Sequence, residues 1–252
     1  MKKLIEYLKK YANDDFLINN FNYSFSLNGD IFTKDEMNKI NIGNNWFEKN
    51  VLLKIIVQSK IKNNPENNED LFFWIIQEWG GIRSFKKNEK NANRIFNSLK
   101  NFKNNLLSND EFSVISSLSK IVSFCDIDRY FIYDSRNIFI INWLILKMKI
   151  FPSIKFFPQP SGRNRIISNY NIESLVNFYY IVNENVTNFE NLYYSSNEAF
   201  FKYIELLKNI NTNVWEKEDK KKHPFYIEML IFSLSTTKIL NDIKESIKIT
   251  LE

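Results

Sequence analysis

The scarcity of chain-breaking residues is the feature that most limits what this sequence can fold into. Only five glycines and five prolines occur in 252 residues, whereas sandwiches and barrels of many short strands need frequent tight turns. Apolar residues instead recur at the spacing of a helix face, as in Leu4, Ile5, Leu8 and Tyr11. The sequence therefore predicts a mostly α-helical fold, a multi-helix globular bundle.

Capping signals show where several of these helices begin and end. In a capping box, a Ser or Thr hydroxyl accepts a hydrogen bond from the amide three residues on, and a Glu carboxylate returns one. The pattern occurs at Thr33–Glu36, Ser108–Glu111 and Ser195–Glu198. Gly80-Gly81 predicts the end of a buried helix, LFFWIIQEW, for which Asp70 is the expected N-cap.

Two segments depart from the helical pattern. Phe21, Tyr23, Phe25 and Leu27 alternate with polar residues before Asn28-Gly29, a pair typical of hairpin turns, so we expect a small N-terminal β-hairpin. Three prolines and Gly162 make the region from Phe151 to Tyr170 an expected irregular loop. We expect a single α-helical domain over residues 1–252, which could divide into subdomains 1–107 and 108–252.

The net charge of +5 is unevenly distributed along the chain. Seven basic residues and one acid lie from Arg83 to Lys103, and three basic residues with no acid lie from Lys155 to Arg165. The basic helix in the first segment is either a solvated face or a surface that follows a nucleic-acid phosphate backbone. The candidate DNA-binding residues are Lys87, Lys90, Arg94, Lys100, Arg163 and Arg165.

Several classes of site and location are disfavoured by composition. Cys125 is the only cysteine and His223 the only histidine, which excludes an intrachain disulfide and a zinc site built from Cys and His. The longest apolar run, Ile138 to Leu146, is far shorter than the roughly 20 residues of a membrane span. The N-terminus lacks the core of a signal peptide. We expect a soluble cytoplasmic protein without a membrane partner.

The stretch from Phe112 to Leu146 combines apolar periodicity with two isolated charges. Two helical patterns flank a polar loop, Cys125 to Arg129. Lys120 lies among apolar residues of the first pattern, and Asp134 opens the second, directly before a strongly apolar run. We expect the Lys120 ammonium and the Asp134 carboxylate to share a partly dry hollow that the basic helix overlooks.

The residues around Lys120, followed by an aromatic-rich loop and then Ile132-Tyr133-Asp134-Ser135-Arg136, resemble the helix–hairpin–helix DNA glycosylases, particularly the branch similar to 8-oxoguanine DNA glycosylase. The resemblance covers roughly residues 113–143. It implies that Lys120 attacks the sugar C1′ and forms a Schiff base, while Asp134 assists departure of the base. It implies DNA as the partner, a role in DNA repair, and chemistry that needs no cofactor and no metal.

The residue types suit this chemistry. A lysine becomes nucleophilic when burial or a nearby cation lowers its pKa, and a carboxylate stabilises a developing sugar cation. Excision also requires a pocket with stacking surfaces for an extruded base, which Tyr130, Tyr133 and Trp143 could provide. The sequence departs from the family at Ser116, Ser117, Leu118 and Ser119, where a glycine-rich hairpin is expected; serine lets a backbone approach phosphate less closely than glycine does.

Plainer roles compete with each of these assignments. Asp134 is also a typical N-cap, and Lys120 could be a surface lysine whose alkyl chain lies along apolar neighbours. Arg136, in the first turn of a helix, is expected to pair with Asp126 or Asp128. The leading hypothesis is a DNA-binding glycosylase-like protein. The alternatives are a non-enzymatic helical module that binds DNA or protein, and a subunit of a larger assembly.

Overall fold

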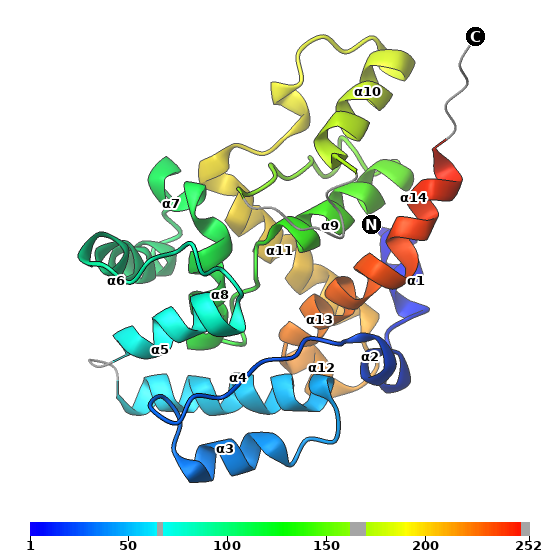
Figure 1. Cartoon of the computed structure of the whole chain (residues 1–252). Helices are drawn as coiled ribbons and strands as arrows, with labels where there is room; N and C mark the ends of the chain where they lie inside the picture. The colour runs from blue at the N-terminus through cyan, green and yellow to red at the C-terminus, as the bar shows by residue number, and fades with distance from the viewer. Residues whose placement is uncertain (65–67, 162–169, 248–252) are drawn as a thin grey trace.

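Helices account for nearly all of the regular structure (Figure 1). The computed structural model describes residues 1–64, 68–161 and 170–247. Across these ranges there is no named strand, and one isolated parallel bridge joins Phe156 to Tyr193. The prediction of a mostly α-helical fold is confirmed.

Most of the elements follow one another with short connections, and the longest connection joins α9 to α10. In chain order they are α1 (Lys2–Lys9), α2 (Asp14–Asn20), α3 (Lys34–Asn41), α4 (Trp46–Asn63), α5 (Glu69–Trp74), η1 (Ile75–Trp79), α6 (Glu89–Lys103), α7 (Asn109–Ser113), α8 (Ile115–Cys125), α9 (Ser135–Lys147), α10 (Ile172–Glu184), η2 (Glu190–Leu192), α11 (Ser196–Val214), α12 (Glu218–Lys222), α13 (Phe225–Leu234), η3 (Ser235–Ile239) and α14 (Leu240–Ser246).

Caps explain several of these boundaries. All three predicted capping boxes form, at the starts of α3, α7 and α11. The N-cap of α5 is Asn68, whereas Asp70 lies in its first turn. The Asp70 prediction is therefore wrong by two positions, because an acidic side chain is also favoured inside the first turn, near the positive end of the helix dipole. Gly80 ends η1, and Gly81 takes the positive φ of 68° that a helix stop favours.

The N-terminal hairpin is not confirmed. Residues 21–28 have no regular secondary structure, although their alternating aromatic residues do pack against the core. The amide of Asn50 on α4 donates to the Tyr23 carbonyl at 2.8 Å and its oxygen accepts the Trp79 indole N–H at 3.0 Å. A side chain thus satisfies a backbone group that a partner strand would otherwise satisfy. The alternation reflects one-sided burial of an extended segment.

Helices α8, α9 and α13 are among the most buried, and each packs against several partners. Helix α8 packs against α4 and η1, and α9 packs against α13 and α10. Figure 1 shows α6 and α7 on one side of this centre and α1 and α14 on the other. Within the described residues, no helix has both the length and the apolarity required to cross a bilayer.

Asn142 interrupts the apolar run of α9 for a structural reason. Its side chain is fully buried and forms two hydrogen bonds with Phe157, accepting from the amide at 2.9 Å and donating to the carbonyl at 2.7 Å. The asparagine thereby fixes the chain that follows α9 against the helix itself.

We predict that Asn142→Leu lowers the free energy of unfolding by roughly 2–4 kcal/mol, because the Phe157 N–H and C=O would be buried without partners. Urea denaturation measures the change. The matched substitution Asn97→Leu on the exposed face of α6 should change stability by less than about 0.5 kcal/mol. Equal effects at the two positions would contradict this account of Asn142.

Candidate active site

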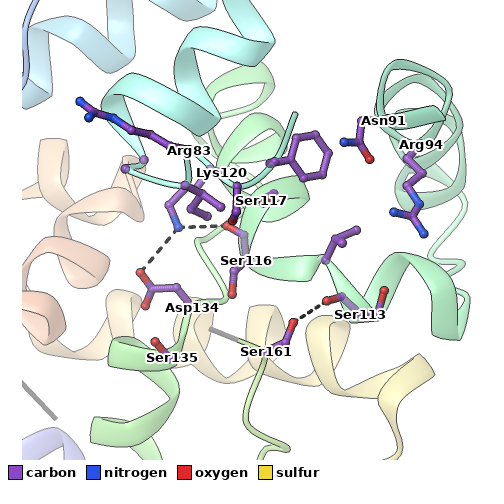
Figure 2. Close-up of a pocket in the computed structure, with 16 residues that line it drawn as sticks. Arg83, Asn91, Arg94, Ser113, Ser116, Ser117, Lys120, Asp134, Ser135 and Ser161 are labelled. Atoms are coloured by element: carbon purple, nitrogen blue, oxygen red, sulfur yellow. Dashed lines mark hydrogen bonds and ion pairs between the residues drawn. The ribbon is translucent and has the colours of Figure 1, made fainter. Parts of the chain in front are cut away.

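The structure brings Lys120 and Asp134 together. Lys120 Nζ lies 3.8 Å from Asp134 Oδ2 and donates a hydrogen bond to the Ser116 carbonyl at 3.0 Å (Figure 2). The two side chains come from neighbouring elements, the middle of α8 and the N-cap of α9. Their predicted proximity is therefore observed.

The Lys120 side chain is only 7% exposed, so its placement as a surface lysine is wrong. Asp134 has two functions at once. Its Oδ1 accepts the Asn137 amide at 2.9 Å and caps α9, while its Oδ2 faces the ammonium group. One oxygen of the Asp134 carboxylate therefore caps the helix, and the other interacts with Lys120.

Burial lowers the pKa of Lys120 below the usual lysine value, because removal from water disfavours the charged form. Asp134 and Glu228 act in the opposite direction and favour the ammonium, whereas Arg136 adds to the lowering. Because burial dominates, more of the neutral amine is present near neutral pH than in an exposed lysine. A neutral amine is the form that attacks an electrophilic carbon.

An open cavity of about 760 Å³ lies on one side of the pair. Asn91 and Arg94 of α6 lie across it from Lys120, and Figure 2 shows both pointing toward the hollow. Its remaining lining is rich in hydroxyl groups, from Ser84, Ser113, Ser116, Ser117, Ser135 and Ser161. A wall of serine hydroxyls and an arginine suits a phosphate-bearing ligand better than an apolar one.

A smaller chamber of about 140 Å³ lies on the other side. Lys120, Asp134 and Gly80 line both spaces, so the ion pair stands at the boundary between them. The chamber has aromatic walls and charged groups at its edges, contributed by Phe21, Tyr23, Lys54, Trp79, Arg136, Glu228 and Phe232.

Gly80 permits the close packing of Lys120. A Cβ atom added at Gly80 would lie 2.7 Å from the Lys120 Cδ atom and 2.7 Å from the Ile76 carbonyl oxygen. Contacts that short do not occur without displacement of one partner. The glycine therefore ends η1 and also leaves the space that the lysine side chain occupies.

The aromatic residues expected to form a base pocket lie elsewhere. Tyr130 and Tyr133 are core residues whose hydroxyls bond to the Phe102 and Pro158 carbonyls, and Trp143 donates to Asp242. None of the three lines either cavity. The aromatic walls come from residues 21–23, η1 and α13, which are too distant in sequence for any local pattern to associate them with Lys120.

Of the expected DNA-binding residues that the structure describes, two form ion pairs with carboxylates and two are exposed on α6. Lys87 pairs with Asp70, and Arg94 pairs with Asp110 through both Nε and Nη2. Lys90 and Lys100 are exposed on α6. Of the six, only Arg94 lines the large cavity, and Arg163 and Arg165 lie outside the described residues.

Arg136 has a different environment from the expected one. Its guanidinium lies 4.0 Å from the centroid of the Phe232 ring, and no ion pair with Asp126 or Asp128 is seen in the described part of the chain. Asp128 instead contacts His223, with 2.7 Å between Oδ1 and Nδ1. Burial lowers the pKa of Arg136, whereas the Asp134 carboxylate acts in the opposite direction, and stacking on the Phe232 ring also stabilises the cation.

Comparison of the chain with protein-family models, curated proteins and solved structures gives no match. No cluster of three or more His, Cys, Asp or Glu side chains that could hold a metal occurs among residues that the structure describes. The function must therefore be inferred from the site itself.

We predict that Lys120 titrates below the value near 10.4 of an unperturbed lysine. The resonance of its ¹³Cε-labelled side chain, assigned by its loss in Lys120→Met, gives the midpoint. Between the folded and unfolded pKa values the unfolded chain binds more protons, so the free energy of unfolding rises with pH in that window. Lys120→Met should reduce this slope in urea denaturation. A midpoint at or above 10.4 would refute the assignment.

We predict that Gly80→Ala destabilises the protein by about 1–3 kcal/mol, because the new methyl group overpacks the contact with Lys120. It should also shift the Lys120 midpoint by moving the ammonium relative to Asp134. Gly29→Ala is the control, since a Cβ atom there meets nothing within 4 Å. An unchanged Lys120 midpoint in Gly80→Ala would show that the glycine does not position the lysine.

Proposed function

We propose that this protein binds DNA and acts on a damaged or modified nucleotide through a Schiff base formed by Lys120. The observation that carries the proposal is the buried Lys120 amine, 3.8 Å from the Asp134 carboxylate, at the boundary between a wide polar cavity and a small aromatic chamber. The resemblance of residues 113–143 to helix–hairpin–helix glycosylases agrees with this assignment.

The chemistry requires a neutral amine and a nearby negative charge. The Lys120 amine adds to the sugar C1′ as the bond to the base breaks, and the electron pair of that bond leaves with the base. A proton passes from the new ammonium to the departing base. The C1′–O4′ bond then breaks as the nitrogen lone pair forms the C=N bond, and O4′ takes a proton from solvent, which leaves a ring-opened, protonated Schiff base. Asp134 stabilises the positive charge that develops on the sugar.

The two cavities suit the two parts of a nucleotide. The wide cavity has hydroxyl groups and Arg94 for contacts with phosphate oxygens. The chamber has Tyr23, Trp79 and Phe232 in its walls, which would provide the stacking surfaces that an extruded base needs. These aromatic residues take the place of Tyr130, Tyr133 and Trp143 in the proposal.

The second candidate is a helical module that binds DNA without chemistry. It is favoured by the exposed lysines of α6, Lys90 and Lys100, which extend beyond the cavity. Such a module needs the positive surface but not the Lys120 amine. A subunit that binds another protein, the third candidate, needs neither.

We predict that borohydride traps a covalent adduct between the protein and duplex DNA that carries an abasic site or a base lesion. Lys120→Met, which keeps the volume of the side chain, should abolish the adduct, whereas the same substitution at the exposed Lys208 of α11 should leave it unchanged. Asp134→Asn keeps a cap oxygen for α9 and should slow adduct formation by about 100-fold. Gel electrophoresis of end-labelled DNA measures the adduct.

The outcomes separate the candidates. No adduct from the wild-type protein across a broad lesion panel would exclude the Schiff-base mechanism. DNA affinity that falls steeply with salt, weakens on charge reversal of Lys90 and Arg94, and ignores Lys120→Met would then indicate the binding module. Negligible DNA affinity together with a co-purifying protein would indicate a partner subunit.

A further inference from the structure

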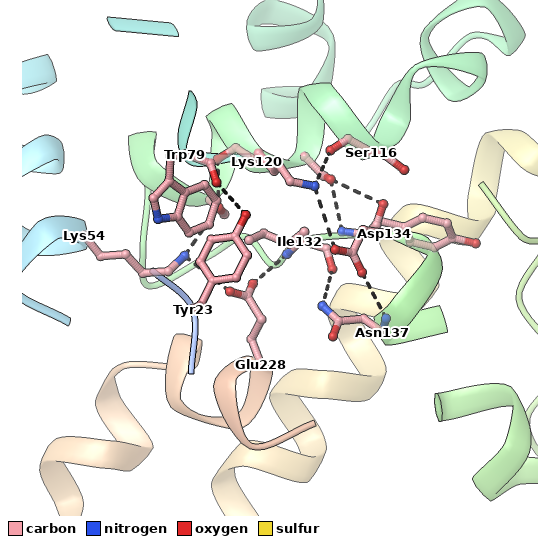
Figure 3. Close-up of polar contacts among 12 residues, drawn as sticks. Tyr23, Lys54, Trp79, Ser116, Lys120, Ile132, Asp134, Asn137 and Glu228 are labelled. Atoms are coloured by element: carbon pink, nitrogen blue, oxygen red, sulfur yellow. Dashed lines mark hydrogen bonds and ion pairs between the residues drawn. The ribbon is translucent and has the colours of Figure 1, made fainter. Parts of the chain in front are cut away.

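A carboxylate from α13 reaches the segment that carries Asp134. The Glu228 side chain is 5% exposed, and its Oε2 accepts the Ile132 amide at 2.6 Å (Figure 3). Its Oε1 lies 3.3 Å from Lys54 Nζ. Both oxygens are therefore engaged inside the protein, and neither touches the Lys120 amine.

The backbone between Ile132 and Asp134 is held at each peptide. The Ile132 carbonyl accepts the Asn137 side-chain amide at 3.1 Å, and the Tyr133 amide donates to Ser119 Oγ at 3.0 Å. Ile132 stands two residues before Asp134, so a shift of its peptide would carry the Asp134 carboxylate with it. Glu228 provides the only one of these bonds that comes from outside α8 and α9.

The Lys54–Glu228 pair also joins three helices. Lys54 extends from α4, donates to Ser123 Oγ of α8 at 3.4 Å, and lies 4.9 Å from the centroid of the Phe124 ring. Buried ion pairs are costly to desolvate, and apolar residues of similar volume often hold helices together at least as well. Apolar residues could not accept the Ile132 N–H, which is the contact nearest to the site.

We propose that Glu228 is a positioning residue of the Lys120–Asp134 site: by fixing the Ile132 peptide, it holds the Asp134 carboxylate beside the Lys120 amine. Its effect on catalysis rests on the proposed function. Its effect on the position of Asp134 does not, and can be measured in the protein without DNA.

Charge and position must be separated in the test, because Glu228 also acts on Lys120 through its charge. The charged and titratable groups that face the chamber are Asp134 and Arg136 beside α9, Glu228 of α13, Lys54 of α4 and Tyr23 of the extended segment. The Glu228 charge favours the Lys120 ammonium and so raises its pKa against the effect of burial. To isolate the hydrogen bond to the Ile132 N–H, a variant that lacks the acceptor must be compared with a second variant that has the same charge and keeps the acceptor.

The experiment compares two double variants with identical charge. Lys54→Met/Glu228→Gln removes the ion pair but keeps an amide oxygen for the Ile132 N–H. Lys54→Met/Glu228→Met removes the acceptor as well. We expect the Met variant to titrate Lys120 at lower pH than the Gln variant, because Asp134 moves away. With abasic-site DNA at saturation, the Met variant should form the borohydride-trapped adduct on the order of 10- to 100-fold more slowly than the Gln variant. The DNA affinity of the two variants should be the same.

Equal Lys120 midpoints and equal adduct rates in the two variants would overturn the proposal. If the wild-type protein forms no adduct, the proposed function fails, and the two Lys120 midpoints alone decide whether Glu228 positions Asp134. Circular dichroism checks that both variants fold. Should the Met variant not fold, Lys54→Met/Glu228→Asn replaces it, because the shorter amide withdraws the acceptor at the same charge.

Discussion

Removing lysine ammonium groups from water is the constraint on which the centre of this structure depends. Lys54 and Lys120 are both buried, and burial lowers the pKa of each. An isolated charge in such a place costs several kcal/mol, so it must be neutralised or paired. Glu228 and Asp134 are the two carboxylates that do so, one from the last third of the chain and one from the cap of α9. The packing of the surrounding helices keeps each of the two lysines beside its carboxylate.

The two pairs are built differently, which suits different roles. Lys54 has aromatic rings around it and its carboxylate partner is also almost fully buried. Lys120 faces a carboxylate that is partly exposed and stands next to open space. The first arrangement joins α4 to α13, whereas the second places the amine at the edge of two cavities.

Local features of the fold were predictable from the sequence, and long-range ones were not. The capping boxes and the Gly80-Gly81 stop depend on neighbours within a few residues, so their chemistry can be read directly from the chain. The conformation of the extended segment at residues 21–28 could not be read in this way, because the donor that satisfies its Tyr23 carbonyl belongs to Asn50 on α4. Alternating burial was therefore mistaken for strand pairing.

The same distinction applies to the site. Lys120 and Asp134 are 14 positions apart on adjoining elements, close enough for apolar periodicity to place them together. Tyr23, Trp79 and Glu228 reach the chamber from three separate regions, and no pattern in a single sequence links them. Tyr130, Tyr133 and Trp143 are near Lys120 in sequence, but their rings are buried in the core and line neither cavity.

The chamber beside Lys120 is lined by segments that lie far apart in the sequence, and this determines when the pKa of Lys120 is lowered. Residues 21–23, α4, η1, α8, α9 and α13 all contribute to its lining, and α13 is the last of these to leave the ribosome. Until α13 docks, the chamber lacks Glu228, Met229 and Phe232, so the burial that lowers the pKa of Lys120 is incomplete. The lowered pKa of Lys120 is thus a property of the finished tertiary structure, and an incompletely synthesised chain would not show it.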